Sequence, residues 1–463
     1  MTRRRRRTIV SLAAAVAVAS AALAGYVSTV GAGSAAAETA SPATGVLSPR
    51  RVPDAFASLV ADTRLASRVN AFIRSLPSTS CVVVRVGDST IVSSQADELL
   101  MPASSLKLTT AAAFLAKVGG KGHFTTTVEG HRPDATGTIS GDVVLVGSGD
   151  PLLADPGYVA TRKHPPKPAT NLADLATALQ QAGVRHIGGG IGVFDGLFDA
   201  ERRVDTWSNG YTTSGDVGPI GALAVDDGFA SYTPRLIAAP DPALAAGDAL
   251  RAALASVGIA VDGPTHRVAT RPMGATLASV NSASYADIVG EMLKESDNNT
   301  AELLLKELAQ TASGAQGTRT AGVAARTAAL RTLGIDPHSV QAIDGSGLDR
   351  SDRATCGVLL ATLTTHPGGY DLEQMLAVAG QTGTLDDRFT TSPLVNKLRA
   401  KTGSLDGVTA LIGITDPAAA LKVRFAFISN GAFDDAGGKA LQDRLIDALA
   451  TFPEAPNASA LAP

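Results

Sequence analysis

The chain has 463 residues, of which 45% are hydrophobic and 18% are charged, and its formal net charge is −3. This length and composition allow about two or three domains with a buried core and exclude an intrinsically disordered protein. The small negative charge, with no basic stripe in the body of the chain, argues against a nucleic-acid partner.

The N-terminus has the pattern of an export signal. Arginines at positions 3 to 7 precede an apolar, alanine-rich run, and A-x-A patterns follow at Ala22–Ala24 and Ala35–Ala37. A basic start, an apolar run and small residues are typical of a secretory signal peptide. We therefore predict a signal peptide over residues 1–37 and action outside the cytoplasmic membrane, in the cell envelope. The alternative is an uncleaved N-terminal segment, which would then attach the chain to the membrane.

The next elements follow a helix–strand–helix order. Residues 38–53 are rich in Ala, Ser, Thr and Pro and are predicted to be a disordered linker. Apolar residues at helical spacing predict a helix over residues 54–76. Residues 81–94 then have the pattern of a β-hairpin with Gly87 in its turn, and another helix is expected to begin near Pro102.

The middle of the chain has a different sequence pattern from the segments on either side of it. Short β-like runs separated by Gly and Pro fill residues 119–279, with helices predicted near 171–182 and 242–257. Helices and then strands resume after this region. A domain interrupted by an insertion explains this order, and the predicted parts are one α/β (α+β) domain over 54–118 and 280–452, a β-rich insertion over 119–279 and a disordered tail over 453–463.

The chain has two cysteines, Cys81 and Cys356. An oxidising compartment would permit a disulfide between them. Both lie in apolar runs, the first strand-like and the second helix-like. We expect two separate buried thiols, with a disulfide as the alternative.

Three short motifs occur in a fixed order: S-x-x-K at Ser104–Lys107, S-D-N at Ser296–Asn298 and K-T-G at Lys401–Gly403. Taken singly, each has an ordinary explanation, because small polar residues cap helices and lysines are commonly exposed. Their order is that of penicillin-binding proteins and serine β-lactamases, and all three lie outside the predicted insertion. The combination favours a catalytic site.

Ser104 and Lys107 lie one helical turn apart and therefore share a face. A serine hydroxyl needs a base before it becomes a good nucleophile, and the seven histidines all lie outside the motifs. Lys107 can accept the proton if its amine is uncharged, and burial with a neighbouring cation such as Lys401 would lower its pKa. We predict that Ser104 is the nucleophile and Lys107 its base, at a helix N-terminus that favours developing negative charge.

Longer stretches around the motifs resemble the D-alanyl-D-alanine carboxypeptidase/endopeptidase family of class C low-molecular-mass penicillin-binding proteins. The resemblance covers nearly everything after the linker and includes MPASSLK, GSGDPLL, DGSGLDRSDRAT, AGQTGTLDDR and NKLRAKTGSLDGVTALIGI. It implies a serine acyl-transferase fold of the β-lactamase-like transpeptidase type, in which helices flank an antiparallel sheet. The two inserted domains of that family would fill the long separation between Lys107 and Ser296.

The resemblance also implies roles for individual catalytic residues. Ser296 would relay a proton to the leaving amine, and Asn298 would hold the substrate amide. The backbone N–H groups of Ser104 and Ser404 would bind the oxyanion. Lys401 would help to hold the terminal carboxylate of the substrate, a role that suits its charge.

Further residues are implied to bind the substrate. Thr402, Gly403 and Ser404 belong to the strand that would hold the carboxylate. Asp195 and Arg350 match, by position, residues that bind the diaminopimelate side chain in some family members. Their ordinary alternatives are a turn residue and a surface cation.

The implied reaction is acyl transfer from a D-Ala-D-Ala stem peptide of peptidoglycan to Ser104, release of D-alanine and hydrolysis. The same groups would cut D-Ala–diaminopimelate cross-links, and penicillin would acylate Ser104. The expected partners are therefore peptidoglycan peptides and β-lactams, with no metal or other cofactor needed. The alternatives are a serine β-lactamase, which shares the motifs, and a non-catalytic module that binds peptidoglycan ends.

Overall fold

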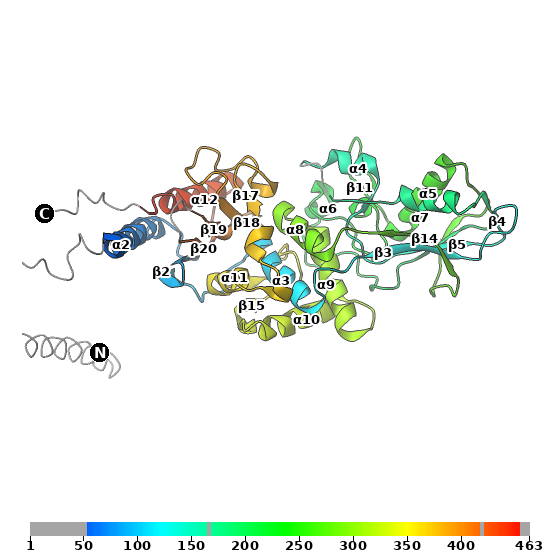
Figure 1. The fold of residues 1–463 in the computed structure, drawn as a ribbon. Helices are drawn as coiled ribbons and strands as arrows, with labels where there is room; N and C mark the ends of the chain where they lie inside the picture. Colours follow the sequence, from blue (N-terminus) through cyan, green and yellow to red (C-terminus); the bar gives the residue numbers. More distant parts are fainter. Residues whose placement is uncertain (1–52, 164–167, 417–420, 454–463) are drawn as a thin grey trace, which may run out of the picture. The chain divides into compact units, whose positions relative to one another are not determined.

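The computed structural model describes residues 53–163, 168–416 and 421–453 (Figure 1). From Asp54 onward, the described residues belong to one compact unit. The predicted signal peptide over 1–37, the linker before Pro53 and the tail after Pro453 lie outside the described residues.

A six-stranded antiparallel sheet forms the centre of the fold, in the order β17-β18-β19-β20-β1-β2. Strand β1 pairs with β20, so that Cys81 lies opposite Ile428 and the two ends of the chain meet in one sheet. Gly87 adopts a φ of +55° in the β1–β2 turn, as a tight hairpin requires. The strands are β1 (Ser80–Val86), β2 (Ser89–Ser94), β17 (Ala377–Val378), β18 (Leu398–Leu405), β19 (Val408–Thr415) and β20 (Val423–Asn430).

Helices cover both faces of this sheet, and successive side chains on a strand alternate between the two cores. In β20, Phe425 and Phe427 pack into the core that includes α2 (Pro53–Ile73) and α12 (Asp435–Leu449). Ala426 and Ile428 pack into the opposite core. The helices of that core are α3 (Lys107–Lys117), α8 (Tyr285–Glu295), α9 (Asn298–Ser313), α10 (Arg319–Thr332) and α11 (Cys356–Leu363).

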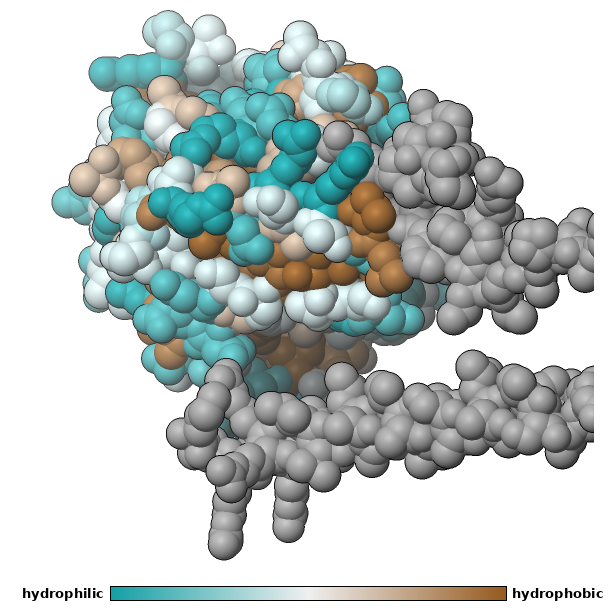
Figure 2. All heavy atoms as spheres, turned by 90° about the vertical axis from the view of Figure 1, so that its left-hand side faces the viewer, coloured by the Kyte–Doolittle hydropathy of each residue, from teal (hydrophilic) through white to brown (hydrophobic). Residues whose placement is uncertain are grey.

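The side of the molecule that carries α2 and α12 is mostly hydrophilic, with an apolar band across it (Figure 2). Polar side chains on the outer faces of these helices are expected, because only their inner faces pack on the sheet. The helix predicted over 54–76 is confirmed as α2, and the hairpin predicted over 81–94 is confirmed as β1 and β2.

Strands β3 to β14 pair among themselves and have a hydrophobic core of their own. A five-stranded sheet has the order β13-β9-β5-β3-β14, and a three-stranded sheet has the order β12-β8-β4. These strands are β3 (Thr125–Gly130), β4 (Thr138–Ile139), β5 (Val143–Val146), β8 (His186–Ile187), β9 (Ile191–Phe194), β12 (Ala260–Val261), β13 (Thr265–Arg267) and β14 (Ala275–Asn281).

Short elements complete the fold. The helices predicted near 171–182 and 242–257 are confirmed as α5 (Ala173–Gln181) and α7 (Pro242–Ser256). The sheet topology agrees with an insertion over 119–279, although the domain boundaries stay a prediction. The remaining helices and strands are α4 (Pro156–Thr161), α6 (Gly210–Ser214), β6 (Leu153–Ala154), β7 (Thr170–Asn171), β10 (Phe229–Ser231), β11 (Ile237–Ala238), β15 (Val340–Gln341) and β16 (Arg353–Ala354).

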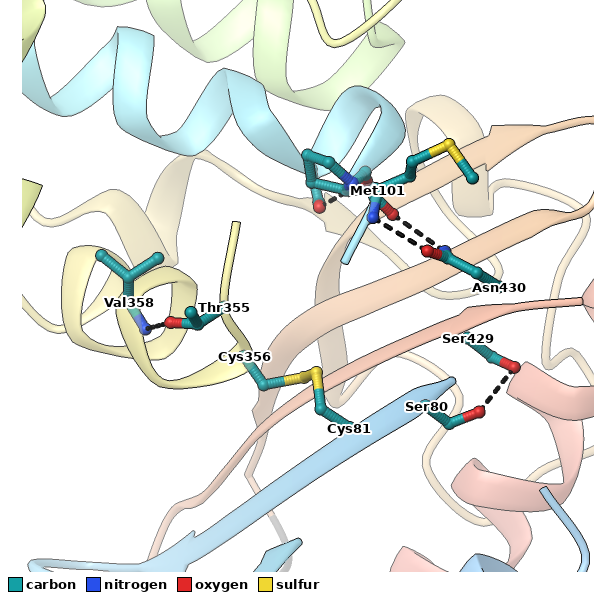
Figure 3. The surroundings of a disulfide bond; sticks show 10 residues. Ser80, Cys81, Met101, Thr355, Cys356, Val358, Ser429 and Asn430 are labelled. Carbon is teal, nitrogen blue, oxygen red and sulfur yellow. Dashed lines mark hydrogen bonds between the residues drawn. A yellow bond between two sulfur atoms is a disulfide. The ribbon is translucent and has the colours of Figure 1, made fainter. Parts of the chain in front are cut away.

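Cys81 and Cys356 form a disulfide, so the expectation of two separate thiols is wrong (Figure 3). Cys81 points from β1 into the core on the α11 side, and Cys356 is the first residue of α11. Their Cα atoms are 6.0 Å apart, which is an ordinary separation for a disulfide. The sequence shows two apolar runs, but only the packing of α11 on β1 brings the sulfurs together.

Candidate active site

Ser104 lies in a 3₁₀ turn, η1 (Ala103–Leu106), that leads directly into α3. In a 3₁₀ turn the side chains at i and i+3 eclipse each other, and the Nζ of Lys107 therefore reaches within 2.8 Å of the Ser104 Oγ. Ala103 adopts a φ of +46°. Such left-handed backbone in a residue with a side chain is costly and clusters at functional sites. The predicted helix start is confirmed, with a tighter first turn.

The amine of Lys107 is fully buried and has three partners. It donates to the Ser104 Oγ, to the Asn298 Oδ1 at 2.6 Å and to the Ser346 carbonyl at 2.8 Å. Burial lowers the pKa of Lys107 to about 8, while the negative charges of Asp344, Asp297 and Glu302 oppose that change. A measurable fraction of the amine is therefore uncharged near neutral pH and able to accept a proton.

The S-D-N motif lies in the turn between α8 and α9. Ser296 ends α8 with a φ of +65°, and Asp297 caps α9 by accepting from the Thr300 N–H at 2.6 Å. Asn298 is the first residue of α9, and its Oδ1 faces Lys107. The capping residue Asp297 thus lies between Ser296, which ends α8, and Asn298, which begins α9.

The K-T-G motif lies within β18, beside the nucleophile turn. The amine of Lys401 is fully buried and donates to the Ser296 Oγ and to the Thr402 carbonyl, both at 2.8 Å. Burial, together with the positive charge of Lys107, holds the pKa of Lys401 well below its ordinary value. The expectation that Lys401 lowers the pKa of Lys107 is wrong, because burial lowers that pKa and the charge of Lys107 instead lowers the pKa of Lys401.

Gly403 allows β18 to approach the nucleophile. A Cβ at this position would lie 2.7 Å from the Pro102 carbonyl oxygen and 3.1 Å from the Ser105 nitrogen. No side chain fits without moving one of the two segments. The third motif thus brings its strand directly against the turn that carries Ser104.

These segments line one cleft with a volume of about 970 Å³. Its wall includes five of the predicted residues, Ser104, Ser296, Asn298, Thr402 and Ser404. Arg350 also lines it and donates to the Asp406 carbonyl at 3.0 Å. Lys107 and Lys401 lie buried beneath this wall and reach it through their hydrogen bonds to Ser104 and Ser296.

Asp195, which the resemblance implied as a substrate-binding residue, does not line this cleft. It is buried at the end of β9, and its carboxylate is paired with Arg202 and with Arg267, the latter at 2.8 Å. Arg267 also pairs with Asp241. Two arginines from other parts of the predicted insertion pair with this carboxylate, and no local sequence pattern indicates that they approach it.

Several residues at the site were not singled out from the sequence. Thr384 lines the cleft, and its Oγ1 lies 3.1 Å from the Thr402 Oγ1. Ser346 supplies the carbonyl that binds Lys107. Both belong to stretches noted above only for their family resemblance, QTGT and DGSG. The carbonyl of Asp216, from the predicted insertion, accepts from the Asn298 Nδ2 at 2.7 Å.

Buried carboxylates hold the DGSG loop beneath the site. The Glu302 Oε1 accepts from the N–H groups of Gly345 and Ser346, at 2.9 and 2.8 Å. Burial raises the pKa of Glu302 to about 7. The Asp344 carboxylate accepts from the N–H of Gly347 at 2.7 Å. These bonds fix the Ser346 carbonyl and, through it, the amine of Lys107.

A serine bonded to a buried lysine is faced by a second pair, in which the lysine lies on a sheet strand and the serine in a turn between two helices. This arrangement defines a serine acyl-transferase of the penicillin-recognising class. The D-Ala-D-Ala carboxypeptidase 3 (S13) family matches residues 66–235 and 230–452 of this chain. The chain belongs to this family.

Characterised relatives agree with this assignment. Carboxypeptidase Rv3627c of Mycobacterium tuberculosis is 34% identical over 351 residues, which cover 73% of this chain and 72% of that protein. The D-alanyl-D-alanine carboxypeptidase of Actinomadura sp. is 28% identical over 435 residues, covering 77% and 78%. The predicted activity, a serine-type D-Ala-D-Ala carboxypeptidase acting in the cell envelope, is confirmed at the level of the family.

Solved structures agree on the fold. Penicillin-binding protein 4 (dacB) from Haemophilus influenzae matches with a TM-score of 0.69 at 22% identity, over 82% of this chain and 98% of that one. Bd3459, a predatory peptidoglycan endopeptidase from Bdellovibrio bacteriovorus, matches with a TM-score of 0.52 at 18% identity, over 81% and 93%. The predicted fold class is confirmed.

The described ranges contain neither a cluster of metal-ligand side chains nor a membrane-spanning helix. No group of three or more His, Cys, Asp or Glu side chains in this part of the chain could hold a metal ion. None of the helices described here combines the length and apolarity that crossing a bilayer demands.

Proposed function

We propose that this protein removes the terminal D-alanine from peptidoglycan stem peptides through an acyl-enzyme formed on Ser104. One observation carries the proposal: the fully buried amine of Lys107 lies 2.8 Å from the Ser104 Oγ. A lysine with a pKa near 8 can take the serine proton at the pH of the cell envelope.

In the first step, the Ser104 Oγ attacks the carbonyl carbon of the penultimate D-Ala, and its proton passes to the Lys107 Nζ. Negative charge develops on the carbonyl oxygen, where the N–H groups of Ser104 and Ser404 would bind it. Asn298 would hold the neighbouring amide of the substrate. Its Oδ1 bonds to Lys107, which links substrate position to the base.

In the second step, the bond to the terminal D-Ala breaks and its nitrogen needs a proton. Ser296 would donate that proton and be reprotonated from Lys401, whose Nζ lies 2.8 Å from the Ser296 Oγ. Lys107 must next give up the proton it took from Ser104, which replaces the proton that Lys401 supplied through Ser296. Water then attacks the acyl-enzyme carbonyl and its proton passes to Lys107. That proton goes to the Ser104 Oγ as the bond between the acyl group and Ser104 breaks. The products are free D-alanine and a stem peptide shortened by one residue.

The terminal carboxylate of the substrate fits the edge of β18. Lys401 lies buried beneath this edge, and the hydroxyls of Thr402 and Ser404 can donate hydrogen bonds to carboxylate oxygens. Thr384 adds a hydroxyl 3.1 Å from that of Thr402. Gly403 keeps this edge close to Ser104.

The same groups can cut D-Ala–diaminopimelate cross-links. The leaving amine is then the side-chain amine of a second stem peptide, and a cleft of about 970 Å³ has room for more than a dipeptide. Arg350 lines this cleft and would bind the free carboxylate of diaminopimelate. Asp195 is assigned a structural role instead, because two arginines already neutralise it.

The location and organisation follow from this activity. Peptidoglycan lies outside the cytoplasmic membrane, so the basic, apolar N-terminus is proposed to be a signal peptide over residues 1–37. The membrane would be contacted only if that segment stays uncleaved. We also propose the domain division given above, with a catalytic domain over 54–118 and 280–452 and an insertion over 119–279.

Release of D-alanine from diacetyl-Lys-D-Ala-D-Ala tests the proposal. The wild-type protein should release D-alanine, and Ser104→Ala should reduce release to background. Lack of release by well-folded wild-type protein would contradict the assignment, and rapid penicillin hydrolysis in its place would favour a β-lactamase. Mass spectrometry of a muropeptide digest separates the two peptidase activities, because carboxypeptidase action shortens stems and endopeptidase action splits cross-linked dimers.

A further inference from the structure

The predicted insertion contributes to the wall of the cleft. Tyr211, Gly215 and Asp216 line it, and they lie in and just after the short helix α6. We propose that the segment from Trp207 to Val217 positions the base Lys107 by two separate routes, so that the insertion is part of the acyl-transfer machinery. This inference rests on the proposed function and assigns Trp207 as a positioning residue.

The first route passes through Asn298. Its side-chain amide has two ends: the Nδ2 donates to the Asp216 carbonyl at 2.7 Å, and the Oδ1 accepts from the Lys107 Nζ at 2.6 Å. A backbone carbonyl accepts only from the NH₂ end of an amide. Asp216 therefore decides which end of Asn298 faces the base.

The adjacent residue is held from the same region. The Asn299 Oδ1 accepts from the Gly218 N–H at 2.8 Å, and its Nδ2 donates to the Asp227 carbonyl at 3.2 Å. Asn299 is buried. The start of α9 is thus bonded to the predicted insertion at Asp216, Gly218 and Asp227.

The second route passes through Asp344. The Trp207 indole Nε1 donates to the Asp344 Oδ2 at 2.9 Å, and the same carboxylate accepts from the N–H groups of Gly347 and Asp349, at 2.7 and 2.8 Å. Trp207 and Asp344 are both buried. The loop held in this way carries the Ser346 carbonyl, which accepts from Lys107 at 2.8 Å.

This loop also touches the nucleophile turn. Gly347 has a φ of +83°, and a Cβ there would lie 2.0 Å from the Ala103 carbonyl oxygen. A shift of this loop would therefore displace both Ala103, which precedes Ser104, and the amine of Lys107. Because both routes from the segment 207–217 end at one amine, loss of either should misplace the base.

Acylation by a fluorescent penicillin tests the inference in wild type, Trp207→Phe and a control, Tyr232→Phe. Trp207→Phe keeps an aromatic ring but removes the donor to Asp344. Tyr232→Phe likewise removes a hydroxyl that donates to a carboxylate, because the Tyr232 OH donates to Asp155 in the predicted insertion. Neither Tyr232 nor Asp155 belongs to the two routes. Time courses over a range of penicillin concentrations separate initial binding from the acylation rate constant.

Trp207→Phe should lower the acylation rate constant about tenfold, the effect of one lost hydrogen bond to a charged group. The dissociation constant of the initial complex and the final labelled fraction should match wild type, and Tyr232→Phe should match it throughout. An unchanged rate constant in fully labelled Trp207→Phe protein would overturn the inference. A wild-type protein that takes no label would instead overturn the proposed function.

A second measurement uses the unaltered chain and decides the matter if Trp207→Phe does not fold. The chain has a single tryptophan, so its tryptophan fluorescence reports on position 207 alone. Acylation of Ser104 should change the emission of wild type, and the same penicillin added to Ser104→Ala should leave it unchanged. Emission that stays constant while Ser104 becomes fully acylated would overturn the proposed coupling.

Discussion

The side-chain amide of Asn430 pairs with the backbone of Met101 as a neighbouring strand would. The Met101 N–H donates to the Asn430 Oδ1 at 2.9 Å, and the Asn430 Nδ2 donates to the Met101 carbonyl at 3.1 Å (Figure 3). Asn430 ends β20, and Met101 precedes the turn that carries Ser104. One side chain thereby ties the nucleophile segment to the central sheet.

We predict that Asn430→Asp lowers both stability and acylation. Aspartate can still accept from the Met101 N–H, but it cannot donate to the Met101 carbonyl, whose partner is lost. An unpaired, partly buried carbonyl costs about 1–3 kcal/mol. Thermal unfolding and penicillin acylation measure the two effects. Wild-type acylation by a clearly destabilised Asn430→Asp protein would show that this pair does not position Ser104.

The disulfide between Cys81 and Cys356 is predicted to stabilise the protein. It closes a loop with a sequence separation of 275 between two fully buried residues, and removal of such a link commonly costs about 2–4 kcal/mol. The double variant with alanine at both positions should unfold at lower urea concentration than wild type, by an amount in that range.

The state of the two sulfurs is checked by a thiol titration of the unfolded, unreduced protein. The disulfide predicts no free thiol before reduction and two after it. Two free thiols before reduction, or an unaltered urea midpoint in the double variant, would contradict the stabilising role.

Gly403→Ala is predicted to impair acylation strongly. The new Cβ would lie 2.7 Å from the Pro102 carbonyl oxygen, so β18 and the nucleophile turn must separate. A misplacement of about 1 Å at a reacting group can cost roughly 100-fold in rate. Penicillin acylation kinetics measure the loss.

Gly290→Ala is the matched control for this prediction. Gly290 lies inside α8, and a Cβ there would meet no atom within 4 Å. Alanine is the better helix former by about 0.5–1 kcal/mol, so this variant should acylate like wild type and unfold slightly later. Equal acylation rates for the two glycine variants would refute the close approach at Gly403.

The acylation rate is predicted to rise with pH through about 8. Burial lowers the pKa of Lys107 to about 8 from its ordinary value of 10.5, and only the uncharged amine accepts the Ser104 proton. The uncharged fraction falls about tenfold for each pH unit well below this pKa. Penicillin acylation measured from about pH 6 to 9 should show this slope and then level off. A rate that is flat or decreasing over that range would rule out Lys107 as the titrating base.

Much of the site was predictable because its chemistry is carried by side chains at fixed spacing. The i to i+3 spacing of Ser104 and Lys107 already implies contact on one helical turn, and 3₁₀ geometry only tightens it. The turn that holds Ser296 and Asn298 was readable from the end of one helical pattern and the start of another. The strands predicted after the middle region are likewise present, and β20 is one of them.

What could not be predicted depends on contacts between distant segments. The Asp216 and Ser346 carbonyls act at the site as backbone groups, so their residue types gave no signal. Asp195 had the residue type expected for substrate binding, but the fold surrounds it with Arg202 and Arg267. The disulfide likewise depends on how one helix packs on one strand, which no local pattern specifies.

The most direct test of the central claim is to map the residue that penicillin acylates. Intact-mass measurement followed by peptide mapping should find one penicilloyl group per chain, on the peptide that contains Ser104. The Lys107→Ala variant should acquire that group far more slowly, and Ser104→Ala should not acquire it. A stable adduct on another residue, or a Lys107→Ala protein that is acylated as fast as wild type, would contradict the account.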